Sequence, residues 1–266
     1  MTDVDVDLLN RASVRLAVDG EVATITLDRP EVLNAQTPST WTALEHIGER
    51  LAPEVLIVVV RGAGRSFSAG LDRRMFGVEG LPGEAGLGTL ARSTPTDIDE
   101  TIDRFQRGFA WLANPRRLTV AAVRGHAIGA GFQLALACDL RLATEDALFT
   151  MAEPSLGIVP DLGGTLPLVR AVGHARAVEI CLTGRRVPAA EALRIGLVNA
   201  VVPVDGLDQA VDELVSTLRE KPVGAIRETL ALLALAADGP TLERQRASER
   251  AAQVRRLVEL RDTFGA

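Results

Sequence analysis

The 266-residue sequence has only two cysteines, Cys138 and Cys181, and both lie in apolar or Ala/Leu-rich segments. Two thiols cannot build a disulfide framework or a thiolate metal cage, and such sparse cysteine use is typical of a reducing compartment. The three histidines, His46, His126 and His174, lie in separate segments without the spacing of metal ligands. We therefore expect no metal site, and we expect the protein to work in the cytoplasm.

Long apolar runs and an excess of basic charge are also missing. No stretch approaches the ~20 apolar residues that a membrane-spanning helix needs. The N-terminus, Met-Thr-Asp-Val-Asp-Val-Asp, carries acids where a signal peptide has basic residues. Lys and Arg total 29 against 35 Asp and Glu, which gives a net charge of −6. This balance disfavours nucleic acid and anionic membranes as partners, and we expect neither export nor membrane insertion.

Apolar periodicity in the first half of the chain predicts alternating strands and helices. Alternation over residues 14–27 around Asp19-Gly20 predicts a β-hairpin with a type I′ turn. Thr37-Pro38 predicts the start of a helix whose apolar positions run to Leu51. Further strands are expected at 55–60, 118–123, 139–143 and 148–150, and further helices at 98–112 and 132–138. This order predicts α/β layers.

The second half has the pattern of a helical segment. From Gly163 onward the periodicity is mainly helical, and beyond Pro203 we expect helices alone. We therefore divide the chain into a core at 1–203 and a helical segment at 204–266. The Ala/Leu/Val-rich helices of the second part are expected to bury surface between subunits.

Two glycine-rich turns, at 61–64 and 125–131, follow predicted strands, where α/β folds place ligand sites. Neither has the spacing of a dinucleotide fingerprint, no Gly-Lys-Ser/Thr of a P-loop occurs, and no Gly-x-Ser-x-Gly marks a serine hydrolase. The glycine-rich stretch at 77–88 predicts a mobile loop where a lid could lie. The common nucleotide and hydrolase sites are thereby disfavoured.

Motifs spread over most of the chain match one family in order. They are Arg29-Pro30 with Leu33-Asn34-Ala35, Ser66-Phe67-Ser68-Ala69-Gly70-Leu71-Asp72, Gly125-His126-Ala127-Ile128-Gly129-Ala130-Gly131, Ala137-Cys138-Asp139, the run from Glu153 to Thr165, Leu182-Thr183-Gly184 and Ala192-x-x-x-Gly196-Leu197-Val198. Over roughly residues 12–203 the chain resembles the crotonase family, the enoyl-CoA hydratases and isomerases.

The resemblance implies a fold, a partner and an assembly. The fold would be an α/β spiral of repeated β-β-α units with a helical C-terminal segment, assembled as a homotrimer or a dimer of trimers. The substrate would be an acyl-CoA thioester, with CoA as part of the substrate and no separate cofactor.

The resemblance also implies the site. The backbone N–H groups of Leu71 and Ala130 would stabilise an enolate at the thioester oxygen, as preorganised donors do. The glycines could instead serve close helix-to-strand packing alone. The residues expected to contact the substrate are Val32, Leu33, Ala69, Asp72, Ile128, Gly131, Gln133 and Leu156.

Proton transfer is expected from Glu153 together with Asp161. Typical hydratases have two glutamates, and Gln133 stands at the place of the first. Because an amide does not exchange a proton near neutral pH, Glu153 would be the base. Its spacing to Asp161 resembles the acid/base pair of dienoyl-CoA isomerases. The alternatives are that Glu153 is a surface residue and that Asp161 caps the following helix.

Three functions stay open on this evidence. We expect double-bond isomerisation of an enoyl- or dienoyl-CoA first, hydration of a 2-enoyl-CoA second, and a catalytically weak acyl-CoA-binding protein third. The arginine-rich stretch from Arg244 to Arg261 is interpreted as a solvated helical face, or as a contact with a neighbouring subunit or with CoA phosphates.

Overall fold

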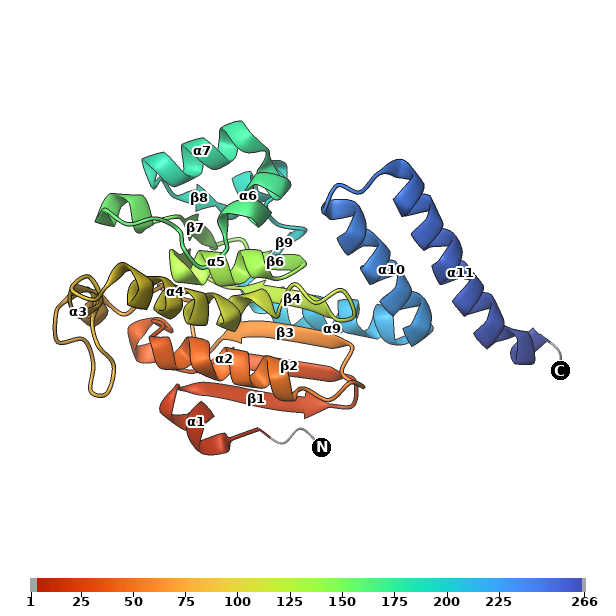
Figure 1. Cartoon of the computed structure of the whole chain (residues 1–266), viewed down its shortest axis with the longest axis horizontal. Helices are drawn as coiled ribbons and strands as arrows, with labels where there is room; N and C mark the ends of the chain where they lie inside the picture. Colours follow the sequence, from red (N-terminus) through yellow and green to blue (C-terminus); the bar gives the residue numbers. More distant parts are fainter. Residues whose placement is uncertain (1–3, 265–266) are drawn as a thin grey trace.

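Two β-sheets form the framework of the chain in the computed structural model, which describes residues 4–264, with side chains through residue 261 (Figure 1). The larger sheet has the order β1-β2-β3-β4-β6-β9 and the smaller one β5-β7-β8. Their strands are β1 (Val14–Asp19), β2 (Val22–Leu27), β3 (Ile57–Gly62), β4 (Leu118–Val123), β6 (Leu140–Thr144) and β9 (Ala200–Val202), then β5 (His126–Ile128), β7 (Leu148–Thr150) and β8 (Val187–Pro188). β1–β2 and β7–β8 pair antiparallel, and the other five pairs of these strands are parallel.

Helices cover both sheets and make up the C-terminal part. They are α1 (Val6–Arg11), α2 (Pro38–Arg50), α3 (Leu87–Leu90), α4 (Pro95–Ala110), α5 (Ala130–Ala137), α6 (Thr165–Val172), α7 (His174–Thr183), α8 (Ala189–Arg194), α9 (Leu207–Arg219), α10 (Val223–Ala237) and α11 (Leu242–Phe264). Four short 3-10 helices lie between them: η1 (Pro30–Val32), η2 (Arg73–Phe76), η3 (Glu153–Leu156) and η4 (Val204–Gly206). None of the helices in the described part is long and apolar enough to cross a membrane.

Three successive units repeat the same order: a strand of the large sheet, a short extended segment and a helix. After β2, Gln36 pairs in parallel with Leu71 before α2 begins, and after β3, Ser68 pairs in parallel with Ala127 ahead of α4. In the third unit β4 leads to β5, which pairs with β7, and then to α5. The predicted α/β chain of β-β-α units is therefore confirmed, and the short segments stack beside one another.

The central strands β3 and β4 of the large sheet are buried on both faces. In β3, Val58 and Val60 belong to the main core under α2 and α4, whereas Ile57 and Val59 face a second core with Leu207 of α9. Because neighbouring side chains of a strand point to opposite faces, a continuous apolar run suits such a strand.

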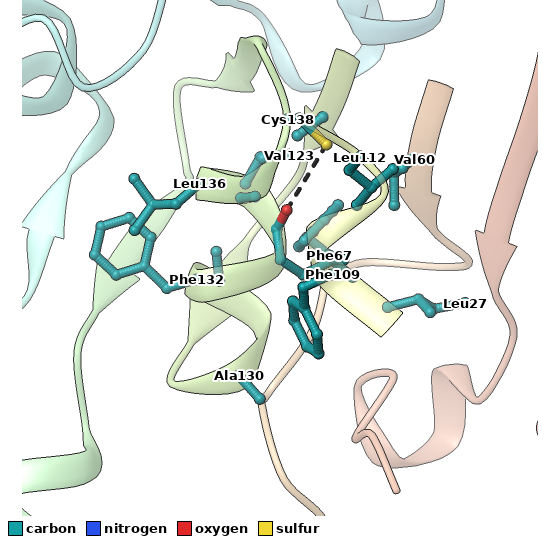
Figure 2. Close-up of a cluster of buried hydrophobic side chains, with 14 of the residues drawn as sticks. Leu27, Val60, Phe67, Phe109, Leu112, Val123, Ala130, Phe132, Leu136 and Cys138 are labelled. Atoms are coloured by element: carbon teal, nitrogen blue, oxygen red, sulfur yellow. Dashed lines mark hydrogen bonds between the residues drawn. The ribbon is translucent and has the colours of Figure 1, made fainter. Parts of the chain in front are cut away.

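Figure 2 shows the part of the main core around α5, the helix that begins at the end of the second glycine turn. Phe109 from α4 and Phe67, which follows the first glycine turn, lie beside α5. Helix α5 carries Ala130 at its start and Leu136 near its end. The Cys138 thiol donates to the Leu134 carbonyl (Sγ to O, 3.7 Å), and burial raises the pKa of this thiol to about 12. The start of α5 is thus anchored by close-packed side chains, which hold position tightly.

All described residues beyond 203 are in helices or their connections, as predicted, because η4, α9, α10 and α11 follow one another. Helix α9 packs on β4 and β6, and α10 reaches the second core through Ile226 and Leu230. Helices α10 and α11 form a hairpin that extends away from the sheets (Figure 1). The division into 1–203 and 204–266, and burial of the second part between subunits, stay predictions.

The predicted type I′ turn is wrong, although the hairpin itself is confirmed. Asp19 pairs with Val22, so the two loop residues are Gly20 and Glu21. Of these two, only Gly20 has a positive φ (+57°). A positive φ at the first loop position alone is the pattern of a type II′ turn.

Several boundaries differ from the sequence-based prediction. Strand β3 covers Ile57–Gly62 rather than 55–60, so part of the first glycine turn is strand, and the second glycine turn contains β5. Strands β8 and β9 and helix α3 were not expected. They are two to four residues long, and so few residues carry too little periodicity to be recognised in the sequence.

Candidate active site

The first glycine turn continues into the residues up to Asp72, and this whole segment, residues 61–72 and called the first turn from here on, is held by a buried polar network. The Ser68 hydroxyl donates to the Asn34 carbonyl (2.8 Å), and its Oγ accepts from the Gln36 amide (3.0 Å) and from the Gly70 N–H (3.2 Å). Trp41 Nε1 donates to Gln36 Oε1 (2.8 Å). These bonds fix the backbone of the segment that leads to Leu71.

Asn34 fastens the start of the same turn. Its Nδ2 donates to the carbonyls of Ala63 (2.8 Å) and Ser66 (2.7 Å), and its Oδ1 accepts from the Arg29 N–H (2.9 Å). The residue has φ +55°, a left-handed conformation that asparagine tolerates better than most residues. Asn34 belongs to one of the sequence motifs, but its role could not be predicted from the sequence because the carbonyls it binds lie about 30 residues away.

Glycines let the two turns touch through their backbones. A Cβ on Gly70 would lie 2.5 Å from the Ile128 carbonyl oxygen, and one on Gly131 would lie 2.7 Å from Ser68 Cβ. Either distance is too short for a real side chain, so only glycine allows this approach. The same added Cβ on Gly70 would lie 3.5 Å from the backbone nitrogen of Ala130. The structure therefore brings together the two turns that sequence reasoning paired.

Two of the free backbone donors in these turns lie next to each other in space. The Leu71 N–H and the Ala130 N–H have no acceptor among the described residues. The Asp72 N–H, which follows Leu71, donates to the Gln36 carbonyl (2.8 Å), and the Gly129 N–H, which precedes Ala130, donates to the Thr150 carbonyl (2.8 Å). Ala130 begins α5, where N–H groups lack partners within the helix and the dipole is positive. Such donors suit an anionic oxygen.

Glu153 lies next to the second turn, at the start of η3 directly after β7. A Cβ on Gly129 would lie 3.2 Å from Glu153 Oε1, and the side chain is 6% exposed. Oε2 is buried and has no hydrogen-bond partner among the described residues. Burial raises the pKa of this carboxyl, and nearby Asp161 raises it further. The alternative that Glu153 is a surface residue is therefore wrong.

Gln133 projects from α5 onto Glu153. Its Nε2 donates to Glu153 Oε1 (2.7 Å), while its Oε1 accepts from the Leu162 N–H (2.9 Å) and the Gly164 N–H (3.2 Å). The side chain is 1% exposed. This amide joins α5, η3 and the turn before α6.

Asp161 lies in that same turn. The residue is half-buried, and desolvation raises the pKa of its carboxyl. Its carbonyl accepts from Gln106 Nε2 of α4 (2.6 Å). Helix α6 has Gly164 at its N-cap and no capping side chain, so the alternative that Asp161 caps this helix is wrong.

The other predicted contact residues lie in the first turn, at the end of β5, in or next to η1, and in η3. Leu33 accepts the Ala69 N–H at its carbonyl (2.8 Å), which places these two side by side, and Ile128 ends β5. Val32 is 36% exposed and Leu156 is 54% exposed. Their contact with a substrate stays a prediction.

Asp72 is held by arginines. Its carboxylate accepts from Arg74 (Nη2, 2.8 Å) and from Arg29 (Nη2, 3.0 Å), and it also accepts the Arg74 N–H (3.1 Å). The hydrogen bonds from Arg74, followed by those from Arg29, hold the pKa of Asp72 well below its usual range. The carboxylate is thus engaged with the fold, and a contact of Asp72 with the substrate stays a prediction.

No cluster of three or more His, Cys, Asp or Glu residues within the described part of the chain is suited to hold a metal ion. Besides the arginine-bound Asp72, the site contains backbone donors, the buried carboxylate of Glu153, the half-buried carboxylate of Asp161 and the amide of Gln133. Such groups can polarise a carbonyl and move a proton.

Comparison with known proteins finds a matching family and similar solved structures. The family described as enoyl-CoA hydratase/isomerase matches residues 18–259. The chain is similar to a proposed enoyl-CoA hydratase of Thermobifida fusca YX solved in complex with CoA, with 46% identity, coverage of 98% of this chain and 100% of that chain, and a TM-score of 0.91. The structure with acetoacetyl-CoA gives 47% identity over 96% of this chain and 99% of that chain, with a TM-score of 0.92.

Curated relatives carry hydratase or dehydratase names. A short-chain-enoyl-CoA hydratase of Clostridium acetobutylicum is 36% identical over 213 residues, which are 77% of this chain and 75% of the relative. A carnitinyl-CoA dehydratase of Salmonella typhi is 37% identical over 209 residues, 77% of this chain and 74% of the relative.

Proposed function

The chain belongs to the enoyl-CoA hydratase/isomerase family, and from that premise we propose that it adds water to the double bond of a 2-enoyl-CoA. One observation carries the proposal: two free backbone N–H groups, of Leu71 and Ala130, lie in adjoining turns beside the buried carboxylate of Glu153. The hydratase names of the relatives favour hydration over the isomerisation expected first from the sequence.

The proposed reaction uses one carboxylate twice. Glu153 removes a proton from water while the water oxygen bonds to C3, and the electrons of the double bond move onto the thioester oxygen. The N–H groups of Leu71 and Ala130 stabilise the resulting enolate. When the enolate collapses, protonated Glu153 returns the proton to C2, which leaves a 3-hydroxyacyl-CoA and restores the carboxylate. The raised pKa of Glu153 suits a group that must both accept and donate.

Isomerisation of the double bond is a second candidate, supported by Gln133. The amide of Gln133 cannot act as a second acid or base beside Glu153. A shift of the double bond needs only one base, which removes a proton from one carbon and returns it to another. Asp161 would be the second carboxyl for a dienoyl substrate. A protein that binds acyl-CoA with little turnover is the third candidate.

Product analysis separates these three functions. The purified protein is incubated with 2-enoyl-, 3-enoyl- and 3,5-dienoyl-CoA in D₂O, with the Glu153→Gln variant as control, and products are identified by mass. A product that has gained the elements of water, formed only by the wild type, supports hydration. A shifted isomer of unchanged composition as the main product transfers the assignment to isomerisation. Binding without turnover of any ester supports the third candidate.

The assembly is proposed separately as a homotrimer or a dimer of trimers. Exposed apolar side chains on α10 and α11 support burial between subunits: Val223, Leu233, Leu242, Val254, Leu257 and Val258 are all more than a third exposed. Light scattering at micromolar concentration should give at least the mass of a trimer. A monomer would contradict this assembly.

A further inference from the structure

The amide of Gln133 is locked in one orientation. Its oxygen accepts from two backbone N–H groups, those of Leu162 and Gly164, and an amide oxygen has two lone pairs to offer. Turning the amide over would place its NH₂ group against both donors and its oxygen against the Glu153 carboxylate. Because both exchanges are repulsive, the NH₂ group must face Glu153.

This orientation makes the two oxygens of Glu153 different. Oε1 accepts from Gln133 at 2.7 Å, whereas Oε2 is buried without a partner among the described residues. An oxygen already engaged in a charge-assisted hydrogen bond is a poorer proton acceptor than a free one. The free oxygen is therefore the one equipped for proton transfer.

We propose that Gln133 is a positioning residue, which holds Glu153 through Oε1 so that Oε2 alone accepts and returns the proton. The inference deepens the proposed function and rests on it. It replaces the expected contact of Gln133 with the substrate by a role that acts through Glu153. The place of a second carboxylate is thus taken by a group that orients the remaining one.

Gln133 also supports Glu153 electrostatically. Burial raises the pKa of Glu153 most, the Gln133 hydrogen bond acts against that rise, and Asp161 adds to it. The other titratable group that interacts with Glu153 is the Cys181 thiol of α7, whose pKa is itself raised, first by burial and then by Glu153. A donor at position 133 thus favours the ionised base, whereas a carboxylate there would oppose it.

The chain offers a matched control in Gln106. Gln106 ties the same turn from the other side, through the Asp161 carbonyl (2.6 Å), but makes no hydrogen bond to Glu153. Gln133→Met removes the donor to Glu153 and the oxygen that accepts from Leu162 and Gly164, with little change of volume. Gln106→Ala removes only the hydrogen bond to the Asp161 carbonyl. A purely structural role of Gln133 would make the two variants alike.

The test measures the pKa of Glu153 and the kinetics in both variants. Carbon-13 NMR of labelled glutamate carboxyls follows Glu153, with its signal assigned by loss in Glu153→Gln. In Gln133→Met we expect a higher Glu153 pKa, a shift of the acidic limb of kcat/KM to higher pH, and a kcat about 10²-fold lower with little change in KM. Gln106→Ala should leave the Glu153 pKa at its wild-type value.

The outcomes separate the inference from the proposed function. An unchanged Glu153 pKa in folded Gln133→Met, or an equal shift in Gln106→Ala, overturns the positioning role. If Gln133→Met does not fold, Gln133→Glu keeps an acceptor for the Leu162 and Gly164 N–H groups and should raise the Glu153 pKa, and no rise overturns the role. A wild type that turns over no enoyl-CoA while the pKa shift is present overturns the proposed function and leaves the Gln133–Glu153 coupling supported.

Discussion

Two buried polar clusters lie at the two ends of the candidate site and differ in one respect. The first-turn network consists of Asn34, Gln36, Trp41 and Ser68, and all its buried side-chain polar atoms have partners. The carboxylate cluster consists of Gln133, Glu153 and Asp161, and it leaves Glu153 Oε2 unpartnered.

This difference distinguishes a cluster that holds the backbone in place from a cluster that is equipped for proton transfer. A fully hydrogen-bonded neutral network holds a backbone in one shape at little cost, whereas an unpaired buried carboxylate oxygen costs stability. Sites that lose stability in this way are characteristically the reactive ones. We therefore expect substitutions in the first-turn network to reduce stability, and substitutions in the carboxylate cluster to reduce turnover.

The largest effect is expected for Glu153→Gln, which should lower kcat by about 10³-fold because the proposed base is lost. The same variant should be more stable by about 1 kcal/mol, since a neutral amide replaces a buried carboxylate. The folded-state pKa of Glu153 is raised, so its ionised form costs stability as pH rises above the unfolded value. The gain in Tm should be largest in mildly alkaline buffer and should vanish as pH falls to about 4. If Glu153→Gln is less stable than wild type at every pH, the claim that the buried carboxylate lowers stability is wrong.

The proposed donor to the thioester oxygen, the Ala130 N–H, lies between the two clusters and can be removed separately. Ala130→Pro removes one N–H at the first position of α5, a position where proline fits a helix. We expect kcat to fall about 10²-fold. Ala130→Ser, which keeps the N–H, is the control, and circular dichroism checks the fold. Full activity in folded Ala130→Pro would place the donor elsewhere.

Asn34→Ala should act on stability. It leaves the carbonyls of Ala63 and Ser66 without their donor, and we expect unfolding in urea to lose about 2 kcal/mol or more. Asn34→Gly, which tolerates the positive φ, separates the lost hydrogen bonds from backbone strain. A changed Glu153 pKa in either variant would show that the two clusters are not separate.

The smallest effect is expected for Asp72→Asn, about 1 kcal/mol near neutral pH. Because the folded pKa of Asp72 is depressed, its stabilisation is present above its unfolded value of about 4 and is lost as pH falls through the folded pKa. Urea unfolding curves of wild type and variant should therefore converge in acid. The exposed Arg15–Asp28 pair is the control, and Asp28→Asn should change little. Equal losses in the free energy of unfolding of Asp72→Asn and Asp28→Asn would show that the buried ion pair stabilises the fold no more than the exposed one.

Much of the fold could be predicted because apolar patterning is local. The strand at 118–123 matches β4 at both ends, and the helix that begins after Thr37 matches α2 at its start. Errors fell where pairing decides the outcome: β3 begins two residues later than predicted, and the hairpin loop is displaced by one residue, to Gly20 and Glu21. Both depend on the register with a neighbouring strand, which a single stretch of sequence does not encode.

What the sequence determined by itself was the set of residues that meet at the site. Glycines at 70 and 131, the amide at 133 and the acids at 153 and 161 stand at recognisable spacings, because close backbone approach and proton transfer need those residue types. Only the tertiary structure decided what each does. Gln133 contacts Glu153 twenty residues away and the turn at 162–164 beyond it. Which atom of a buried amide faces a carboxylate depends on every donor around it, and packing alone brings those donors together.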